Sequence, residues 1–109
     1  MKHFILEGTH LAAFEQFAHL ELLHHEFLQN GYDSGAFLFS GPQVPSHGWF
    51  LAARAESRDQ LDALRAEEPF VKGGFMQFDS VTQFEPAQHQ PLLKEWFEGE
   101  PLEYSTGLS

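Results

Sequence analysis

Residues 24–42, HHEFLQNGYDSGAFLFSGP, are the stretch that decides the fold. Its first part is typical of the end of a helix, its glycine-rich middle is typical of a turn, and the apolar run that follows is typical of a strand. We expect the strand to stop at Ser40-Gly41-Pro42, because glycine followed by proline usually marks a turn. The Ser-Gly-Pro corner is expected to lie beside a pocket.

Two helices are predicted from apolar periodicity and from capping residues. The first spans residues 11–30 with Thr9 as a candidate cap, and its apolar residues at three- and four-residue steps would face a sheet. The second opens with a capping box formed by Ser57 and Gln60. Pro69 limits its length, because the residue before a proline avoids the helical conformation.

Four strands are predicted around these helices, so the element order is βαββαβ. They span residues 2–8, 36–41, 48–55 and 75–84. Two split βαβ units form a four-stranded antiparallel sheet with both helices on one face, which is the ferredoxin-like α+β fold. The other face of such a sheet needs a cover, and a second copy of the chain would supply it by packing two sheets together. We therefore expect a homodimer or a higher homo-oligomer.

The chain after this unit is predicted to be an extension. We place the domain at residues 1–87 and the extension at residues 88–109. Pro91 can begin a short helix, PLLKEWFE, whose apolar side chains are expected to pack on a partner or on a sheet edge. Residues 99–109 are polar and are expected to form an arm.

Composition excludes several classes of function. The 109 residues carry six Lys and Arg against sixteen Asp and Glu, a formal charge of −10, so neither nucleic acid nor an anionic membrane is an expected partner. There is no cysteine, which excludes disulfides and thiol catalysis. The first ten residues lack a signal-peptide core, and no apolar run approaches the ~20 residues that span a bilayer. We expect a cytoplasmic protein.

Metal and cofactor sites are not predicted. The chain has seven histidines, and Glu21 and His25 could share one helix face, but two ligands are fewer than typical catalytic zinc requires. The sequence contains no phosphate loop, dinucleotide fingerprint or nucleophilic triad. We therefore expect no metal and no cofactor.

His24 and Glu68 are the candidate catalytic residues. His24 lies on the apolar stripe of the first helix, so its imidazole is expected to point toward the sheet. Glu68 is expected to lie where the second helix ends, where a carboxylate opposes the helix dipole. A carboxylate in contact with an imidazole fixes the ring tautomer and makes the other nitrogen a better base. A buried structural histidine and a solvated helix end remain the alternatives.

The order of these motifs resembles the YciI-like family over residues 1–87. The resemblance rests on His24, the Gly-x-Phe-Leu-x-Ser-Gly-Pro run that ends at Pro42, the Gly48-x-Phe-Leu-Ala segment and Glu-Pro-Phe at residues 68–70. It implies a ferredoxin-like fold whose dimers form an α/β barrel. It also implies active-site roles for a histidine and an aspartate, which fall on His24 and Glu68. Most members of that family have no assigned reaction.

Three positions depart from the pattern that the resemblance implies. Glu68 replaces an aspartate, and Glu21 and Ser46 stand where relatives often carry arginine. Without these two cations, the resemblance no longer implies an acidic substrate unless another residue takes the role of the arginines. Either the substrate differs from that of the relatives or the site is decaying.

Two hypotheses of function remain open from the sequence, and a purely structural role is a third. The first is a cofactor-independent lyase or isomerase that acts on a small cyclic or aromatic molecule. His24 would transfer the proton, Glu68 would orient it, and the pocket would be lined by Ser40, Gly41, Pro42 and Phe70. The second is a module that binds a small ligand at the same pocket without turnover.

Overall fold

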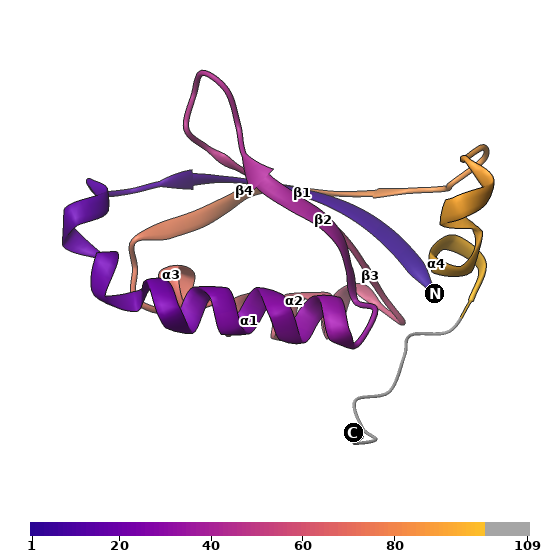
Figure 1. Cartoon of the computed structure of the whole chain (residues 1–109), viewed down its shortest axis with the longest axis horizontal. Coiled ribbons are helices and arrows are strands. Elements are labelled where there is room, and N and C mark those ends of the chain that lie inside the picture. Colours follow the sequence, from indigo (N-terminus) through magenta and orange to yellow (C-terminus); the bar gives the residue numbers. More distant parts are fainter. Residues whose placement is uncertain (100–109) are drawn as a thin grey trace.

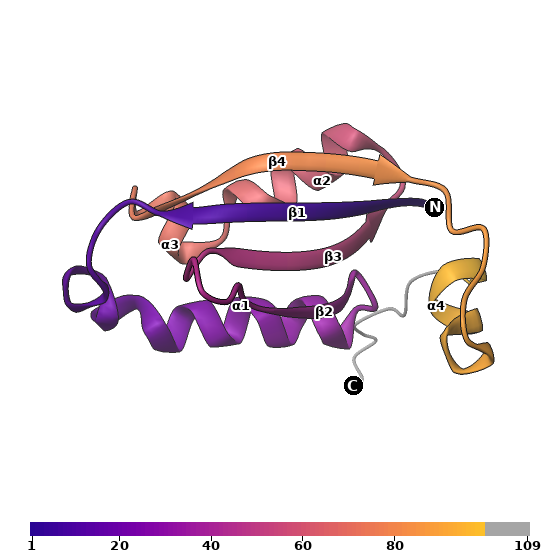
Figure 2. The same cartoon turned by 90° about the horizontal axis from the view of Figure 1, so that it is seen from above.

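Four antiparallel strands form one sheet in the order β2-β3-β1-β4 (Figure 1). The computed structural model describes residues 1–99. The strands are β1 (Lys2–His10), β2 (Phe37–Pro42), β3 (Trp49–Ala55) and β4 (Met76–Phe84). Three helices cover one face of the sheet: α1 (Glu21–Asp33), α2 (Arg58–Ala66) and α3 (Pro69–Lys72) (Figures 1 and 2). The ferredoxin-like α+β architecture predicted from the sequence is confirmed.

The core lies between the sheet and these helices. Side chains alternate along a strand, so Phe4 and Leu6 of β1 point to the helical face together with Leu51 of β3. Phe27 and Leu64 pack against them from α1 and α2. None of the helices within residues 1–99 is long and apolar enough to cross a lipid bilayer.

The start of the first helix differs from the prediction. The expected helix over residues 11–30 is wrong at its beginning: two 3-10 turns, Phe14–Gln16 and Ala18–Leu20, precede α1. Phe17 joins the two turns with φ −127° and ψ 10°, outside the α-helical region, and its ring is fully buried. Thr9, the candidate cap, donates instead to Asp79 on β4. Burial of Phe17 and the lack of a capping side chain explain the broken start.

The turn between α1 and β2 follows the sequence prediction in part. Gly31, expected to end the helix, lies inside it, where a Cβ would stand 2.0 Å from the ring of Phe37. Gly31 thus allows β2 to pack against α1. The reversal itself uses Gly35, whose φ of 82° lies in the left-handed region that glycine adopts readily.

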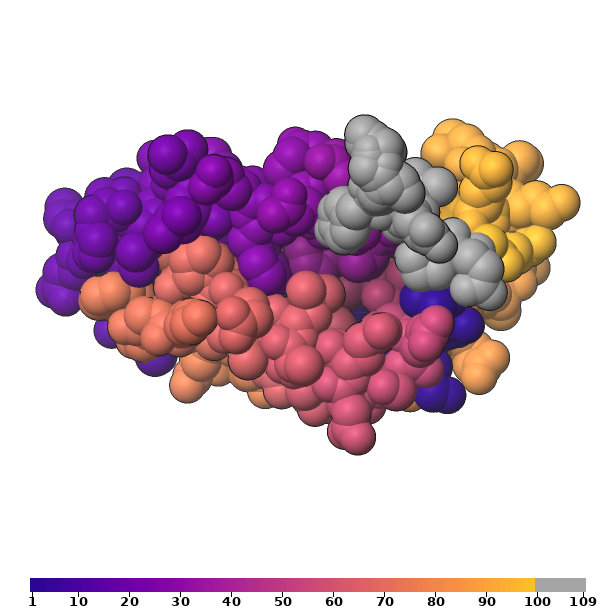
Figure 3. All heavy atoms as spheres, turned by 90° about the horizontal axis from the view of Figure 1, so that it is seen from below, coloured from indigo at the N-terminus to yellow at the C-terminus, as the bar shows by residue number. Residues whose placement is uncertain are grey.

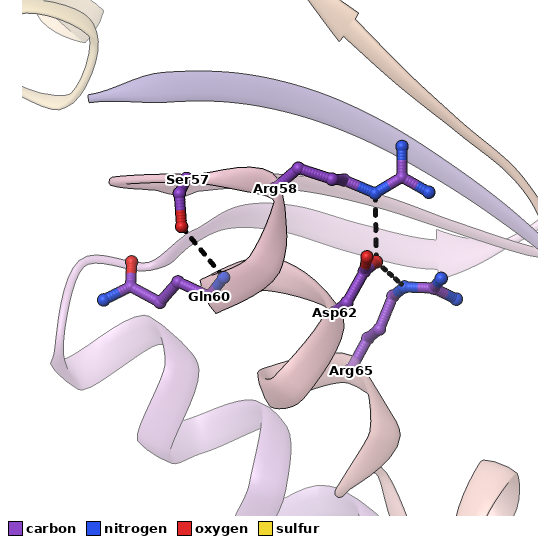
Figure 4. A network of polar contacts seen from close by, with 5 residues as sticks. All are labelled: Ser57, Arg58, Gln60, Asp62 and Arg65. Carbon is purple, nitrogen blue, oxygen red and sulfur yellow. Dashed lines mark hydrogen bonds and ion pairs between the residues drawn. The ribbon is translucent and has the colours of Figure 1, made fainter.

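The second helix begins as predicted but ends earlier than Glu68. Ser57 Oγ accepts from Gln60 N–H at 3.0 Å (Figure 4). Gln60 Oε1 in turn accepts from Glu56 N–H at 2.7 Å. Asp62 accepts from both Arg58 and Arg65 on the exposed side of α2 (Figure 4), and these hydrogen bonds lower the pKa of its carboxyl.

The placement of Glu68 at the end of the second helix is wrong. α2 ends at Ala66, and Glu68 is the N-cap of α3, with Pro69 in the first turn. Proline at this position starts a helix readily because it needs no N–H donor there. The carboxylate of Glu68 therefore complements the dipole of α3 instead of opposing the dipole of α2.

The C-terminal helix packs on its own chain. A 3-10 turn, Pro91–Leu93, leads into α4 (Lys94–Glu98), as the sequence predicts. Trp96 and Phe97 contact His3 of β1, and Arg54 of β3 donates to the carbonyl oxygens of Gly35, Trp96 and Gly99. The helix thus contacts the central strands β1 and β3, and Phe97 also contacts Phe84 of the edge strand β4. The expected arm lies outside the described residues apart from Gly99.

Candidate functional site

Five chain segments meet at the end of the sheet opposite α4 (Figures 1 and 2). His10 ends β1, Trp49 begins β3 and Met76 begins β4, so antiparallel pairing brings them to one end of the sheet. His24 lies in the first turn of α1, and Glu68 precedes α3. The topology therefore places two histidines and a carboxylate between the sheet and the helices.

His24 and Glu68 are in direct contact. Nδ1 of His24 is hydrogen-bonded to Oε1 of Glu68, and the two residues are 4% and 2% exposed. The second carboxylate oxygen, Oε2, accepts from Val71 N–H at 2.9 Å. Both oxygens of Glu68 are thus used, whereas Nε2 of His24 has no hydrogen-bond partner within residues 1–99.

Aromatic rings hold the imidazole of His24 in place. Phe70 stacks on it with ring centroids 4.2 Å apart and an interplanar angle of 11°, and Trp49 meets it edge-on at 5.4 Å. Glu68 and Phe70 flank Pro69, so one short segment supplies both the carboxylate and the stacking ring. This arrangement restricts the orientation of Nε2.

A cavity of about 170 Å³ opens beside His24. Its lining is mostly aromatic and contains three histidines: His10, Phe14, Phe17, Glu21, His24, His25, Trp49, Phe70 and Met76. An apolar cavity of roughly 150 Å³ accommodates a benzene molecule. The cavity is therefore large enough for one six-membered ring.

A larger cavity of about 610 Å³ adjoins it. The two share His10 and Phe14, and the larger one is otherwise lined by the β2–β3 loop and the chain after β1: Thr9, Ala12, Pro42, Gln43, Ser46, His47 and Gly48. His47 has φ 63°, a conformation that residues other than glycine adopt seldom, often at functional sites. No Lys or Arg of the described chain lines either cavity.

The structure distributes the remaining predicted site residues unevenly. Phe70 lines the smaller cavity and Pro42 lines the larger one. Ser40 is hydrogen-bonded to the hydroxyl of Tyr32, and Gly41 pairs with Phe50 in the sheet; neither lines either of these two cavities within the described chain. Glu21 and Ser46, which replace the expected arginines, do line the cavities.

His10 was missed in the sequence because the first strand was ended at residue 8. Extending the alternation of Phe4 and Leu6 through Gly8 places His10 on the helical face, which is where the structure has it. Burial lowers the pKa of His10, and positive charge on His24 or His47 lowers this pKa further, while Glu68 raises it. Within residues 1–99, no three His, Asp or Glu side chains are grouped closely enough to hold a metal ion.

A separate hollow lies on the helical side of the molecule (Figure 3). It measures about 600 Å³ and runs between α1 and the α2–α3 segment, lined mainly by apolar side chains such as Leu23 and Phe27. Three charged residues line it, and two of these, Glu67 and Lys72, are paired with each other at the surface. It brings no acid/base pair together and is not the candidate site.

The fold and site define a small ferredoxin-like α+β protein with a histidine–carboxylate pair beside a ring-sized cavity. A scan against family models found no match, and a search of curated proteins by sequence found none. Among solved structures, the chain is similar to 5-chloro-2-hydroxyhydroquinone dehydrochlorinase (TftG) of Burkholderia phenoliruptrix AC1100 in complex with 2,5-dihydroxybenzoquinone. The TM-score is 0.61 and the sequence identity 19%, covering 83% of this chain and 96% of that one. At this identity the likeness shows the fold, and the YciI-like resemblance stays a prediction.

Proposed function

We propose that this protein is a cofactor-independent enzyme of the lyase or isomerase type. It acts by general acid/base catalysis on a small cyclic or aromatic molecule held beside His24. The observation that carries the proposal is the buried contact between His24 and Glu68 at the wall of a cavity of about 170 Å³.

The chemistry follows from the geometry of the pair. Glu68 accepts a hydrogen bond from Nδ1 of His24, which leaves the lone pair of the neutral ring on Nε2. Nε2 takes a proton from a substrate atom, and the imidazolium returns it at the same or another atom. A positioned acid or base of this kind contributes a rate factor of about 10²–10⁴.

The aromatic walls favour a planar substrate. Phe17, Trp49 and Phe70 offer ring faces and edges to a bound ring, and such contacts contribute about 0.5–1.5 kcal/mol each beyond the area they bury. TftG, with a similar fold, is a dehydrochlorinase of a chlorinated hydroxyhydroquinone and binds 2,5-dihydroxybenzoquinone. A single ring with oxygen substituents is therefore the substrate class to test first.

The experiment compares variants on a panel of single-ring compounds. The panel contains 5-chloro-2-hydroxyhydroquinone, other phenols and ring ketones, with absorbance and proton release as readouts. His24→Ala is expected to lower turnover about 10²-fold or more. His19→Ala is the matched control, because His19 is an exposed histidine of the preceding 3-10 turn. Turnover that survives His24→Ala unchanged would remove His24 from the mechanism.

A binding module without turnover is the second candidate. The observation in its favour is the absence of Lys and Arg from the linings of both cavities in the described chain, because the resemblance predicts arginines there. Saturable binding of a ring compound with no chemical change, abolished by His24→Ala, would support this candidate over the enzyme.

We also propose that the chain forms a homodimer through the open face of its sheet. Phe39 and Phe50 stack there with ring centroids 5.9 Å apart, and Phe39 is 50% exposed. A second sheet packed on this face would bury both rings.

Light scattering is expected to give about twice the 12.4 kDa of one chain. Phe39→Glu is expected to give the monomer, whereas Leu22→Glu on the helical side leaves the mass unchanged; a monomeric wild type would contradict the proposal.

A further inference from the structure

A second imidazole faces the proposed substrate cavity from the sheet. His10 lies at the end of β1 and is half-buried. Its ring contacts Phe17 at a centroid distance of 5.2 Å and meets Phe70 edge-on at 6.5 Å. Because Phe70 also stacks on His24, the two imidazoles border the same aromatic wall. His10 lines both cavities and so stands where they join.

Most other polar side chains around the two cavities already have hydrogen-bond partners. Thr9 donates to Asp79, the amide nitrogen of Gln43 donates to Glu7, and Ser46 donates to Gln43.

Among the described residues that line the two cavities, few side chains have hydrogen-bonding capacity to spare. They are the acceptor Glu21, the indole N–H of Trp49 and the imidazoles of His10, His25 and His47, besides Nε2 of His24. Glu21, His25 and His47 are exposed, which leaves His10 as the half-buried imidazole with both ring nitrogens unpaired. An unpaired donor at a cavity wall is available to a ligand.

The surroundings of His10 favour its uncharged form. α1 presents Glu21, His24 and His25 to the cavity, the residue before α3 is Glu68, the β2–β3 loop presents His47, and β4 presents the apolar Met76. Burial is the main cause that lowers the pKa of His10, and the neighbouring histidines add to it. A neutral imidazole carries one N–H donor and one acceptor nitrogen.

We propose that His10 is a neutral hydrogen-bond donor to an oxygen on the substrate ring, opposite the proton-transferring His24. The proposal rests on the proposed function and narrows the substrate class to phenols, ring ketones and quinones. A neutral imidazole that polarises a carbonyl beside a separate carboxylate base is a known solution for proton abstraction next to an oxygen-bearing carbon.

The step balances without an oxidant or a cofactor. From a ring ketone, Nε2 of His24 takes a proton of the C–H next to the carbonyl, and the bonding electron pair forms an enolate with the negative charge on the carbonyl oxygen. From a phenol, Nε2 takes the O–H proton, and the electron pair stays on that oxygen. The oxygen, now negatively charged, accepts a hydrogen bond from His10. The electron pair then returns, and either His24 gives the proton to a different ring atom or a leaving group departs with its own pair. Donors placed at such an oxyanion contribute a rate factor of about 10²–10³.

The test uses phenol and toluene, which are similar in size, but phenol carries a hydroxyl group where toluene carries a methyl group. Their affinities for the full-length protein are measured by NMR titration for wild type, His10→Leu and His10→Gln. His10→Leu is expected to lower the affinity for phenol about 3- to 10-fold, which corresponds to the loss of one net hydrogen bond. The affinity for toluene is expected to change by no more than about twofold. His10→Gln retains an N–H donor and is expected to keep the preference for phenol.

The outcomes separate this inference from the proposed function. If His10→Leu lowers the affinities for phenol and toluene equally, or leaves the preference for phenol unchanged, the role of His10 is refuted while the proposed function stands. If neither compound binds the wild type, or if His24→Ala leaves their affinities unchanged, both the role of His10 and the proposed function are refuted. If His10→Leu does not fold, ¹⁵N-histidine spectra of wild type decide: phenol is expected to shift the N–H of a neutral His10, and an unmoved signal refutes the proposal.

Discussion

Replacing Glu68 by glutamine tests whether the protein needs both carboxylate oxygens. One oxygen pairs with His24 Nδ1 and the other with Val71 N–H, on a side chain that is 2% exposed. Glutamine has one acceptor oxygen, so with the proton of His24 on Nδ1, as the proposed mechanism requires, one of these two donors loses its partner. An unsatisfied buried donor costs about 1–3 kcal/mol, and we expect Glu68→Gln to lower the free energy of unfolding by that amount.

Two further substitutions are expected to destabilise the protein more and less, respectively, than Glu68→Gln does. Glu68→Ala removes the partner of a buried pair as well as the cap of α3, for which about 3–5 kcal/mol is expected. Glu68→Asp retains both oxygens and the capping role, so its stability is expected to lie between those of wild type and Glu68→Gln. Glu67→Gln is the matched control: Glu67 is 63% exposed and pairs with Lys72 at the surface. Its effect is expected to stay within about 0.5 kcal/mol.

Urea unfolding at a fixed protein concentration measures the series, because a self-associating chain changes its apparent stability with concentration. Unchanged m-values would show that the comparison concerns stability alone. For a domain of this size each kcal/mol corresponds to a Tm shift of about 4–8 °C. A Glu68→Gln variant as stable as Glu67→Gln would refute the reasoning that both oxygens are engaged.

Two other predictions concern the frame around the site. Gly31→Ala places a Cβ against the ring of Phe37 and is expected to cost about 1–3 kcal/mol in urea unfolding, whereas Gly41→Ala, with open space at its Cβ, is expected to be neutral; equal effects would contradict the packing argument. Burial lowers the pKa of His3, and the N-terminal amine and Arg54 lower it further. Because of this lowered pKa, the folded state binds fewer protons than the unfolded state, so the stability that is present above about pH 6.5 is lost as the pH falls. His3→Phe is expected to flatten the dependence of Tm on pH between about 7.5 and 5, and an unchanged slope would refute it.

The sheet and the pair of His24 and Glu68 could be proposed from the sequence because these features depend on local patterns. Alternation and turn residues located all four strands, and the helical stripe pointed His24 toward the sheet. Residue order alone could not locate the broken start of the first helix. The rings that surround Phe17, namely Phe70 and Phe75, come from a distant segment, and their packing overrides helical periodicity.

Two features of the site could not be predicted from local patterns. Pro69 follows the second helix, as predicted, but it also starts α3, and this makes Glu68 a cap whose carboxylate contacts His24. Ser40 lies in the predicted strand, but its hydroxyl is hydrogen-bonded to Tyr32 of α1 and does not line either of the two cavities beside His24. A hydroxyl on an edge strand cannot be assigned a partner until the facing helix is placed.

The charges around the cavities restrict which ligands the site accepts. Glu21 is the carboxylate that lines the smaller cavity, Glu68 is bonded to His24 at its wall, and no Lys or Arg of the described chain lines either cavity. An anionic ring would lose its hydration there without a fixed cation in exchange, which is costly in a partly buried space. A neutral ring loses less, and in the proposed site a hydrogen bond from His10 would replace one that its oxygen made to water. In the proposed mechanism, negative charge on the ring develops only after His24 has taken a proton, at the moment when the imidazolium beside it carries the compensating positive charge. The proposal therefore predicts a substrate that enters uncharged and becomes charged only during the reaction.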